Sequence, residues 1–138
     1  MASFTVLIVD DFEPFRRLVC SILKARAEFR VIDQVSDGLQ AVQKAEGHQP
    51  DLILLDIGLP ILNGMMVARR VRKLAPASKI LFLTQGSSPD VVQEGLALGA
   101  LGYVYKPLAH SDLLPAIEAV LRGSQFVSTN VAEEQVGG

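Results

Sequence analysis

Short apolar runs alternate with segments of helical periodicity along most of the chain, and this alternation restricts the fold more than any other feature. Five runs have the length of a strand: Thr5–Val9, Arg30–Val35, Asp51–Leu55, Lys79–Thr84 and Gly102–Lys106. Two of them are continuously apolar over Leu52–Leu55 and Ile80–Leu83, as expected of strands that helices cover on both faces. The alternation predicts an α/β fold with a five-stranded parallel sheet.

Helical segments separate these runs. Their apolar residues recur at helical spacing over Pro14–Arg26, Gly38–Glu46, Gly64–Leu74, Pro89–Leu98 and Asp112–Arg122. Gly99 and Gly123 follow the last two segments, where helices commonly end on a left-handed residue. Pro115 is tolerated in the first turn of a helix and disfavoured in its interior, so we expect the last helix to begin close to it.

The length of the chain fits one domain. With 138 residues, of which 49% are hydrophobic and 20% charged, the chain can bury one core and lacks the composition of a disordered segment. After Gly123 the helical pattern stops, and the chain ends in Gly137-Gly138. We therefore assign residues 1–123 to one domain and residues 124–138 to a C-terminal tail or linker stub.

Charge and hydropathy exclude several classes of function. Thirteen Lys and Arg against fifteen Asp and Glu give a net charge of -2, so the chain lacks the basic field that a nucleic-acid backbone attracts. The longest apolar runs are far shorter than the roughly 20 residues of a membrane span, and the N-terminus has no secretory pattern. We expect a cytoplasmic protein that binds no membrane and, by itself, no nucleic acid.

Polar residues follow the predicted strands at the points where the strands end. Asp10 and Asp11 follow the first strand, Asp56 follows the third, Thr84 ends the fourth and Lys106 ends the fifth. In an open parallel sheet these ends share one edge, where ligands bind. Carboxylates that converge there repel one another unless a cation is present. Mg2+ suits such a site because it prefers oxygen ligands and is held by carboxylates together with a phosphate.

Lys106 and Thr84 add a positive charge and a hydroxyl group to this predicted edge. A lysine, a hydroxyl and a metal ion around one carboxylate provide the stabilisation and orientation that phosphoryl transfer to that carboxylate needs. Each residue also has a simpler interpretation when taken alone. A strand-terminal Asp can cap the next helix, Thr84 can be a turn residue, and Lys106 can extend to solvent. Their coincidence at four strand ends favours one shared site.

Taken in order, these residues resemble the receiver domain of two-component response regulators. The resemblance extends from about Phe4 to Gly123. Its motifs are Ile8-Val9-Asp10-Asp11, the run Asp51–Pro60, Asn63-Gly64, Thr84 and the run Gly99–Pro107. It implies a flavodoxin-like, CheY-like doubly wound fold, with five parallel strands in the order 2-1-3-4-5.

The resemblance makes Asp56 the phosphoacceptor, which takes a phosphoryl group from a sensor histidine kinase. It implies that Asp11 and Asp56 bind Mg2+ directly, together with the backbone carbonyl of Gly58, and that Asp10 acts through a bound water. The chain would then be a switch and not an enzyme that turns over a substrate. Its own chemistry would be limited to self-phosphorylation and self-dephosphorylation.

The resemblance also assigns the switch to Thr84 and Tyr103. Thr84 would bind a phosphoryl oxygen, and Tyr103 would swing inward with it. Lys106 would pair with the phosphoryl group, and the peptide bond between Lys106 and Pro107 would be cis. Of Tyr103 and Tyr105, which share the fifth predicted strand, we expect one at the surface, which suits a contact role for Tyr103.

Two glycines beside the predicted site distinguish this chain from common members of the family. Gly58 and Gly86 lie two residues after Asp56 and Thr84, respectively, and carry no side chain. We hypothesise that they leave an acyl phosphate on Asp56 open to water unless Gln85 covers it.

Residues Ala97–Val127 resemble receivers that precede a helix-turn-helix output domain of the LuxR or NarL type. Such a domain needs several tens of further residues, so we expect DNA binding only through an output domain outside this chain. The whole protein would then be a transcription regulator. A stand-alone receiver that acts through protein-protein contacts stays open, as does a phosphorylation-driven homodimer.

Two other functions fit the residues less well. A phosphatase of the haloacid dehalogenase kind places its nucleophile after the first strand in an Asp-x-Asp arrangement, whereas Asp10 and Asp11 are adjacent and Asp56 is distant. A flavodoxin-like flavin binder needs a phosphate loop rich in Ser, Thr and Gly. The acidic run Asp10–Glu13 would repel a phosphate that brought no metal.

Two remaining features have structural interpretations. Basic residues cluster in the third predicted helix, where we interpret them as its solvated face. They are Arg69, Arg70, Arg72 and Lys73. Cys20 is the single cysteine and lies among apolar residues, so we expect a core thiol and not a redox centre.

Overall fold

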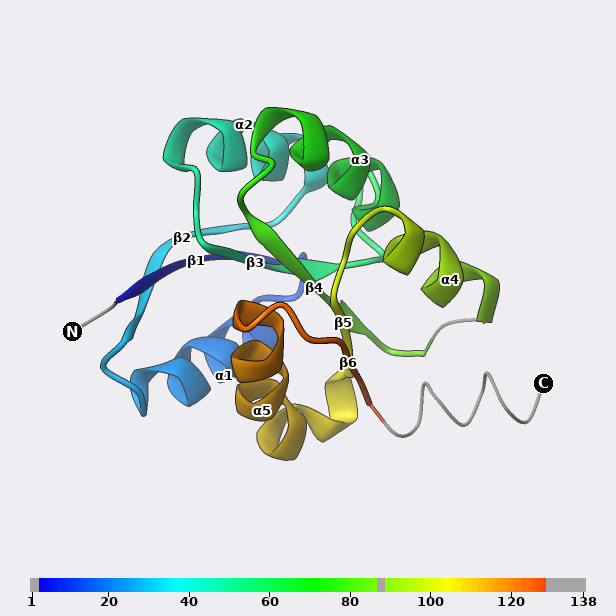
Figure 1. Cartoon of the computed structure of the whole chain (residues 1–138). Coiled ribbons are helices and arrows are strands. Elements are labelled where there is room, and N and C mark those ends of the chain that lie inside the picture. The colour runs from blue at the N-terminus through cyan, green and yellow to red at the C-terminus, as the bar shows by residue number, and fades with distance from the viewer. Residues whose placement is uncertain (1–2, 87–88, 129–138) are drawn as a thin grey trace.

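The structure is a computed structural model that describes residues 3–86 and 89–128, and it places a sheet between two layers of helices (Figure 1). The elements are β1 (Phe4–Val9), α1 (Glu13–Lys24), β2 (Phe29–Val35), α2 (Gly38–His48), β3 (Leu52–Asp56), α3 (Gly64–Leu74), β4 (Lys79–Thr84), α4 (Pro89–Ala97), β5 (Gly102–Tyr105), the short 3-10 helix η1 (Lys106–Leu108), α5 (Ala109–Leu121) and β6 (Phe126–Val127). The strands pair in parallel in the order β2-β1-β3-β4-β5-β6. The predicted class and the order of the first five strands are confirmed, and β6 is an addition.

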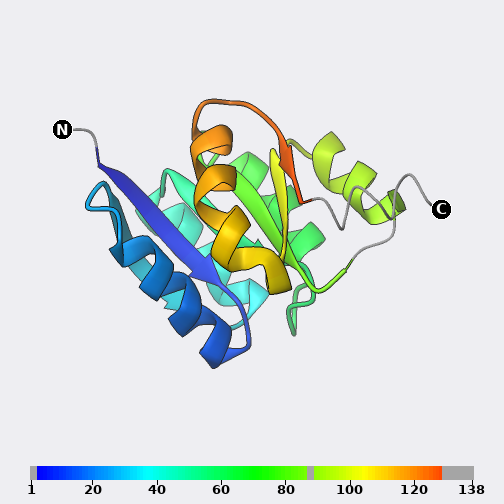
Figure 2. The ribbon, with the colours of Figure 1, turned by 90° about the horizontal axis from the view of Figure 1, so that it is seen from below.

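A hydrophobic core lies on each face of the sheet. Helices α2, α3 and α4 cover one face, and α1 and α5 lie side by side across the other (Figure 2). Leu54 points into the core beneath α1 and α5, whereas its neighbour Leu55 points into the opposite core. Successive residues of a strand face opposite sides, so a strand covered on both faces is apolar throughout. All five residues of β3 are buried for this reason.

Helix α5 begins earlier than expected. It starts at Ala109, so Pro115 lies inside the helix and not in its first turn. A proline there removes one helical hydrogen bond and crowds the preceding turn. The helix continues because Leu113, Ala116 and Ile117 are fully buried on its inner side, whereas Pro115 is exposed. Packing of the apolar face therefore overrides the local preference of proline.

Helix boundaries elsewhere follow the local signals. Gly99 and Gly123 have φ angles of 95° and 82°, so both adopt the predicted left-handed conformation. The side chain of Asn63 accepts a hydrogen bond from the amide of Met66 and caps α3. Within residues 3–86 and 89–128, no helix has the length and apolar character that crossing a membrane requires.

Strand β6 lies in the segment that the sequence marked as a tail. Ser128, which follows β6, is fully buried. Its amide donates to the carbonyl oxygen of Tyr103 at 2.9 Å. Its hydroxyl donates to Asp112 Oδ2 at 2.7 Å and accepts from the amide of Tyr105 at 3.0 Å. A two-residue strand is too short to show a period in the sequence, and its anchor is a polar side chain.

We expect Ser128→Ala to lower the free energy of unfolding by about 1–3 kcal/mol, because it leaves the Tyr105 amide and the Asp112 carboxylate without their buried partner. Urea denaturation measures the change. Ser124→Ala is the matched control, since Ser124 is exposed and its substitution should shift stability by less than about 0.5 kcal/mol. Equal effects of the two substitutions would contradict an anchoring role for Ser128.

Candidate functional site

Four strand ends bring the predicted site residues together at the carboxyl edge of the sheet. Asp10 and Asp11 follow β1, Asp56 ends β3, Thr84 ends β4 and Lys106 directly follows β5. These four strands are neighbours in the sheet. Carboxylate oxygens of the three aspartates all lie within 4.8 Å of one another. The structure therefore assembles one acidic cluster, with a hydroxyl and an ammonium group at the adjacent strand ends.

Asp10 is held rigidly at the base of the cluster. Its residue is fully buried, and its Oδ1 accepts a hydrogen bond from the amide of Phe12 at 2.8 Å. The guanidinium of Arg16 donates to the Asp10 carbonyl oxygen at 2.6 Å. Asp10 Oδ2 is buried without a hydrogen bond, and its partner is the ammonium of Lys106 at 2.6 Å. Asp10 thus holds the turn that leads into α1 and carries a charge into the site, whereas the N-cap of α1 is Phe12 and has no side-chain cap.

Lys106 is buried and not a surface lysine. The residue is 8% exposed, and its Nζ also lies 3.5 Å from Asp56 Oδ1. Its ammonium sits 4.8 Å from the centre of the Phe15 ring, a distance at which the ring attracts a cation. The two carboxylates and the ring therefore fix the position of the charge.

Asp56 combines burial with an uncommitted oxygen. The residue is 7% exposed, and its Oδ1 accepts a hydrogen bond from the amide of Gly58 at 3.1 Å. No residue in the described part of the chain forms a hydrogen bond or ion pair with Oδ2. Burial raises the pKa of Asp56, and the charges of Asp10 and Asp11 add to the rise, whereas Lys106 and the Gly58 amide oppose it.

The loop after β3 folds tightly behind Asp56. Gly64, the first residue of α3, donates its amide to the carbonyl oxygen of Ile57 at 2.8 Å. A Cβ at position 64 would lie 2.6 Å from the carbonyl oxygen of Asp56, so only glycine permits this approach. Gly58 is exposed, and among the described residues a Cβ there would have only Asp56 Oδ1 nearby, at 4.0 Å. The space above Asp56 is therefore open on the side of Gly58.

Thr84 and Tyr103 lie on neighbouring strands beside the cluster. Thr84 is buried, and its Oγ1 accepts a hydrogen bond from the amide of Gly86 at 3.1 Å. Tyr103 is fully buried, so the expectation of a surface position for it is wrong. Tyr105, two residues along the strand, is partly buried and contacts the same core. Residues two apart in a strand share a face, and α4 covers that face at Tyr103.

Sequence reasoning did not single out Phe15 or Arg16, and it noted Gly64 only as part of the Asn63-Gly64 motif. Phe15 shows only the apolar periodicity of a core residue, and its contact with Lys106 joins elements far apart in the chain. Arg16 binds a backbone carbonyl, which no side-chain pattern records. Gly64 was visible as a glycine next to a helix cap, but its close approach to Asp56 depends on how the loop folds.

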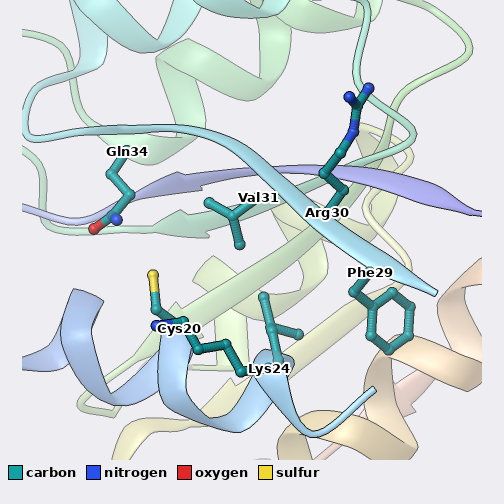
Figure 3. A pocket seen from close by; sticks show the side chains of 7 residues that line it. Cys20, Lys24, Phe29, Arg30, Val31 and Gln34 are labelled. Carbon is teal, nitrogen blue, oxygen red and sulfur yellow. The ribbon is translucent and has the colours of Figure 1, made fainter. Parts of the chain in front are cut away.

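A surface pocket of about 410 Å³ lies away from this site, between α1 and β2 (Figure 3). It is lined by Cys20, Leu23, Lys24, Phe29, Arg30, Val31 and Gln34. Cys20 is partly buried against the core beneath α1, and burial raises the pKa of its thiol. A raised pKa disfavours the reactive thiolate, consistent with a packing role for this residue.

The response regulator receiver domain family matches residues 6–118 of the chain. The chain belongs to this family. A putative transcriptional regulator of Pseudomonas aeruginosa is 39% identical over 118 residues, which cover 86% of this chain and 56% of that protein. The nitrate/nitrite response regulator protein NarL of Escherichia coli is 30% identical over 124 residues, which cover 90% of this chain and 57% of that protein.

A solved structure of a LuxR-family two-component response regulator from Aurantimonas has the same fold as this receiver. The TM-score is 0.91 at 26% identity, and the superposition covers 99% of this chain and 97% of that one. The predicted resemblance to the LuxR/NarL type is confirmed by these relatives. The receiver spans little more than half the length of the curated relatives described above.

The acidic cluster of this receiver fits a hard divalent cation. All three candidate ligands are carboxylates, and oxygen donors of this kind are preferred by Mg2+. The cluster brings three carboxylates to one ammonium, which lies 2.6 Å from Asp10 Oδ2 and 3.5 Å from Asp56 Oδ1, so it holds more negative charge than Lys106 balances. Asp11 is exposed at the mouth of the cluster, where a hydrated ion has access.

One detail that the resemblance implied is wrong. The peptide bond between Lys106 and Pro107 is trans, as are all peptide bonds of the described residues. Lys106 begins the helical turn η1 at this point, and trans bonds are the lower-energy form for that geometry.

We expect Asp56→Asn to raise the melting temperature of the receiver in a chelator at neutral pH. The raised pKa means that ionised Asp56 is less favourable in the folded chain than in the unfolded chain. The increase in melting temperature should be complete at pH values above the pKa of Asp56 in the folded chain. It should vanish below pH ~4, the ordinary aspartate pKa, where Asp56 is protonated in both the folded and the unfolded chain. Thermal denaturation from pH 3 to 8 measures it.

Added Mg2+ should reverse the order of stability in the same experiment. The ion binds ionised carboxylates, so it should stabilise the wild type more than Asp56→Asn. Its stabilisation of the wild type should decrease as the pH falls and the carboxylates become protonated. Glu46→Gln is the matched control because Glu46 is an exposed carboxylate on α2. If both variants respond to Mg2+ as the wild type does, the cluster is not the binding site.

Proposed function

We propose that this receiver is a phosphorylation-dependent switch in which Asp56 accepts a phosphoryl group from the phosphohistidine of a sensor histidine kinase. The observation that carries the proposal is Asp56 Oδ2, which forms no hydrogen bond within residues 3–86 and 89–128 and lies next to an ammonium inside an acidic cluster. In the transfer, Oδ2 forms a bond to phosphorus and the phosphorus-nitrogen bond of the donor breaks. The nitrogen keeps the electron pair of the broken bond, so a donor protonated on its other ring nitrogen leaves as neutral imidazole, and Asp56 becomes an acyl phosphate.

Mg2+ is the cofactor that this proposal requires. Asp11, Asp56 and the carbonyl of Gly58 would hold it directly, and Asp10 through a water. When bound, it neutralises charge on the phosphoryl oxygens and on the cluster, so that one anion can attack another. The chain's own residues do the rest by orientation, because phosphoryl transfer depends mainly on positioning and electrostatics.

Lys106 and Thr84 are proposed to bind the phosphoryl group once it is on Asp56. Lys106 Nζ lies 3.5 Å from Asp56 Oδ1 and is held by Asp10 and Phe15, so it needs little reorganisation to pair with a phosphoryl oxygen. The Thr84 hydroxyl lies at the end of the next strand and can donate to another oxygen. Tyr103 is proposed to follow the movement of Thr84 and report it to α4.

The proposed partners are a sensor histidine kinase on the input side and an output domain on the other. Relatives of the receiver are named transcriptional regulators and response regulators, and the receiver spans little more than half of their length. We therefore propose that the switch controls a helix-turn-helix DNA-binding domain of the LuxR/NarL type outside these residues. The receiver is a signalling domain, and any turnover is limited to loss of its own phosphoryl group.

Incubation with a small phosphodonor and Mg2+ should add one phosphoryl group to the wild type and none to Asp56→Asn, because an acyl phosphate cannot form without the carboxylate. Intact-mass spectrometry measures the addition. Hydroxylamine should remove it, as expected of an acyl phosphate.

Asp90→Asn is the control for this experiment. Asp90 is an exposed aspartate in the first turn of α4, so its loss should leave the modification unchanged. A phosphoryl group that persists in Asp56→Asn would refute the assignment of the acceptor.

Gly58→Leu should lengthen the lifetime of the phosphoryl group. The side chain has room, since Gly58 is exposed and its Cβ position meets only Asp56 Oδ1, at 4.0 Å, in the part of the chain that the structure describes. An apolar side chain there reduces the access of water to the acyl phosphate. Phosphate release after removal of the donor measures the lifetime, and Gly47→Leu on the exposed side of α2 is the control. An unchanged lifetime would show that water reaches the phosphate from another side.

A further inference from the structure

The side chain of Tyr103 is enclosed between the sheet and α4. Its ring stacks on Phe82, with ring centres 5.2 Å apart and an interplanar angle of 28°. Its hydroxyl lies 3.0 Å from the carbonyl oxygen of Val91 and 3.2 Å from that of Val92, and donates to these α4 carbonyls. The tyrosine is therefore tied to α4 by its polar end and to β4 by its ring.

Gly95 provides the space into which the hydroxyl fits. A Cβ at position 95 would overlap the hydroxyl oxygen of Tyr103 and would lie 2.9 Å from its Cζ and 3.0 Å from Phe82 Cε2. Gly95 is buried within α4, and its φ is not positive, so the backbone does not require glycine there. The absence of a side chain at position 95 therefore makes room for the tyrosine ring.

Helix α4 is fastened to α3 on both sides of this glycine, and the two helices lie side by side (Figure 1). Arg69 forms an ion pair with Glu94 at 2.6 Å. Arg72 donates to the carbonyl oxygen of Ala97 at 3.3 Å. We call the space that Phe82 and Gly95 form around the Tyr103 ring the Tyr103 socket. The basic cluster of α3 is exposed, as the sequence indicated, but Arg69 and Arg72 also hold α4, which forms one wall of this socket.

The socket is connected to the acidic cluster by two short stretches of strand. Tyr103 lies three residues before Lys106, and Phe82 lies two residues before Thr84. A displacement of either strand end therefore reaches the ring through a few bonded residues. The ring contacts α4 between the two points where Arg69 and Arg72 hold that helix, so a movement of the helix there strains these contacts.

We propose that Gly95 is a positioning residue that admits the Tyr103 ring under α4 and thereby couples the position of that ring to the helix. The coupling to phosphorylation rests on the function proposed above, whereas the socket itself does not. A side chain at position 95 and an inward Tyr103 exclude each other. The identity of residue 95 therefore determines whether α4 can respond to the tyrosine.

Gly95→Ala tests the socket, and Gly47→Ala is its matched control. Both glycines lie near the ends of helices, but a Cβ at position 47 has nothing within 4 Å. The chain has two tyrosines and no tryptophan, so a Tyr105→Phe background leaves Tyr103 as the only source of tyrosinate absorbance. Burial, with a contribution from Glu94, raises the pKa of Tyr103 above its ordinary range.

Tyrosinate absorbance is recorded immediately after jumps to alkaline pH. In the Tyr105→Phe background Tyr103 should resist ionisation, and Gly47→Ala should leave that resistance unchanged. Gly95→Ala should release the ring, so that it ionises near pH ~10, as an exposed tyrosine does. Resistance that persists in Gly95→Ala would overturn the proposal.

A second comparison guards against general unfolding. Gly95→Ala should lower the melting temperature of the wild type by more than it lowers that of Tyr103→Phe, because the phenylalanine lacks the overlapping oxygen. Equal losses in the two backgrounds would show that the Tyr103 hydroxyl, which makes the closest overlap, is not the obstacle and would overturn the socket.

Hydrogen exchange of α4, measured before and after phosphorylation, tests the coupling. Phosphorylation should change exchange in the wild type and in Gly47→Ala, and should leave it unchanged in Gly95→Ala at equal phosphoryl content. A full response in Gly95→Ala would overturn the coupling. Absence of phosphorylation in all three chains would instead refute the function proposed for Asp56. The absorbance measurement would still show whether Gly95 admits the Tyr103 ring.

Discussion

The buried ion pair between Lys106 and Asp10 is the interaction on which the site depends. Burying two charges is costly unless their geometry and remaining contacts compensate, and here the ammonium lies 2.6 Å from Asp10 Oδ2 and 4.8 Å from the centre of the Phe15 ring, while Asp10 Oδ1 accepts from the Phe12 amide. When all the carboxylates are ionised, three carboxylates and one ammonium leave a formal charge of -2 at the sheet edge. A divalent cation balances that charge. The arrangement is thus stable enough to fold and still attracts a metal ion.

The sheet makes this concentration of charge possible. Because all strands are parallel, the ends of β1, β3, β4 and β5 meet at one edge, and each strand is buried by apolar residues up to its polar terminus. The two cores stabilise the frame from both sides, so the charged residues need contribute little to folding. This separation explains why motifs far apart in the sequence could be assigned to one site before their contacts were known.

Local sequence signals were sufficient to predict the elements that are long and periodic. They were insufficient where a contact between distant parts of the chain determines a helix boundary or the burial of a side chain. The strands followed from apolar runs, their order from the resemblance to receiver domains, and the left-handed glycines at positions 99 and 123 from helix ends. The start of α5 did not, because burial of Leu113 and Ile117 outweighs the preference of Pro115. The surface position expected for Tyr103 rested on placing Tyr103 and Tyr105 on opposite faces of the strand, whereas residues two apart share a face and both contact the core under α4.

A phosphoryl group on Asp56 would act first on the ion pair between Lys106 and Asp10. Such a group brings about -1.5 to -2 charges near pH 7, beside an ammonium that already has Asp10 as its partner at 2.6 Å. Lys106 directly follows β5, so we propose that its pairing with the new anion is transmitted to the strand that carries Tyr103. The ring of Tyr103 is enclosed by Phe82 and Gly95, and close-packed interiors move between discrete arrangements and do not deform continuously. A small electrostatic displacement at the sheet edge can therefore become a change in the position of α4, provided that residue 95 has no side chain.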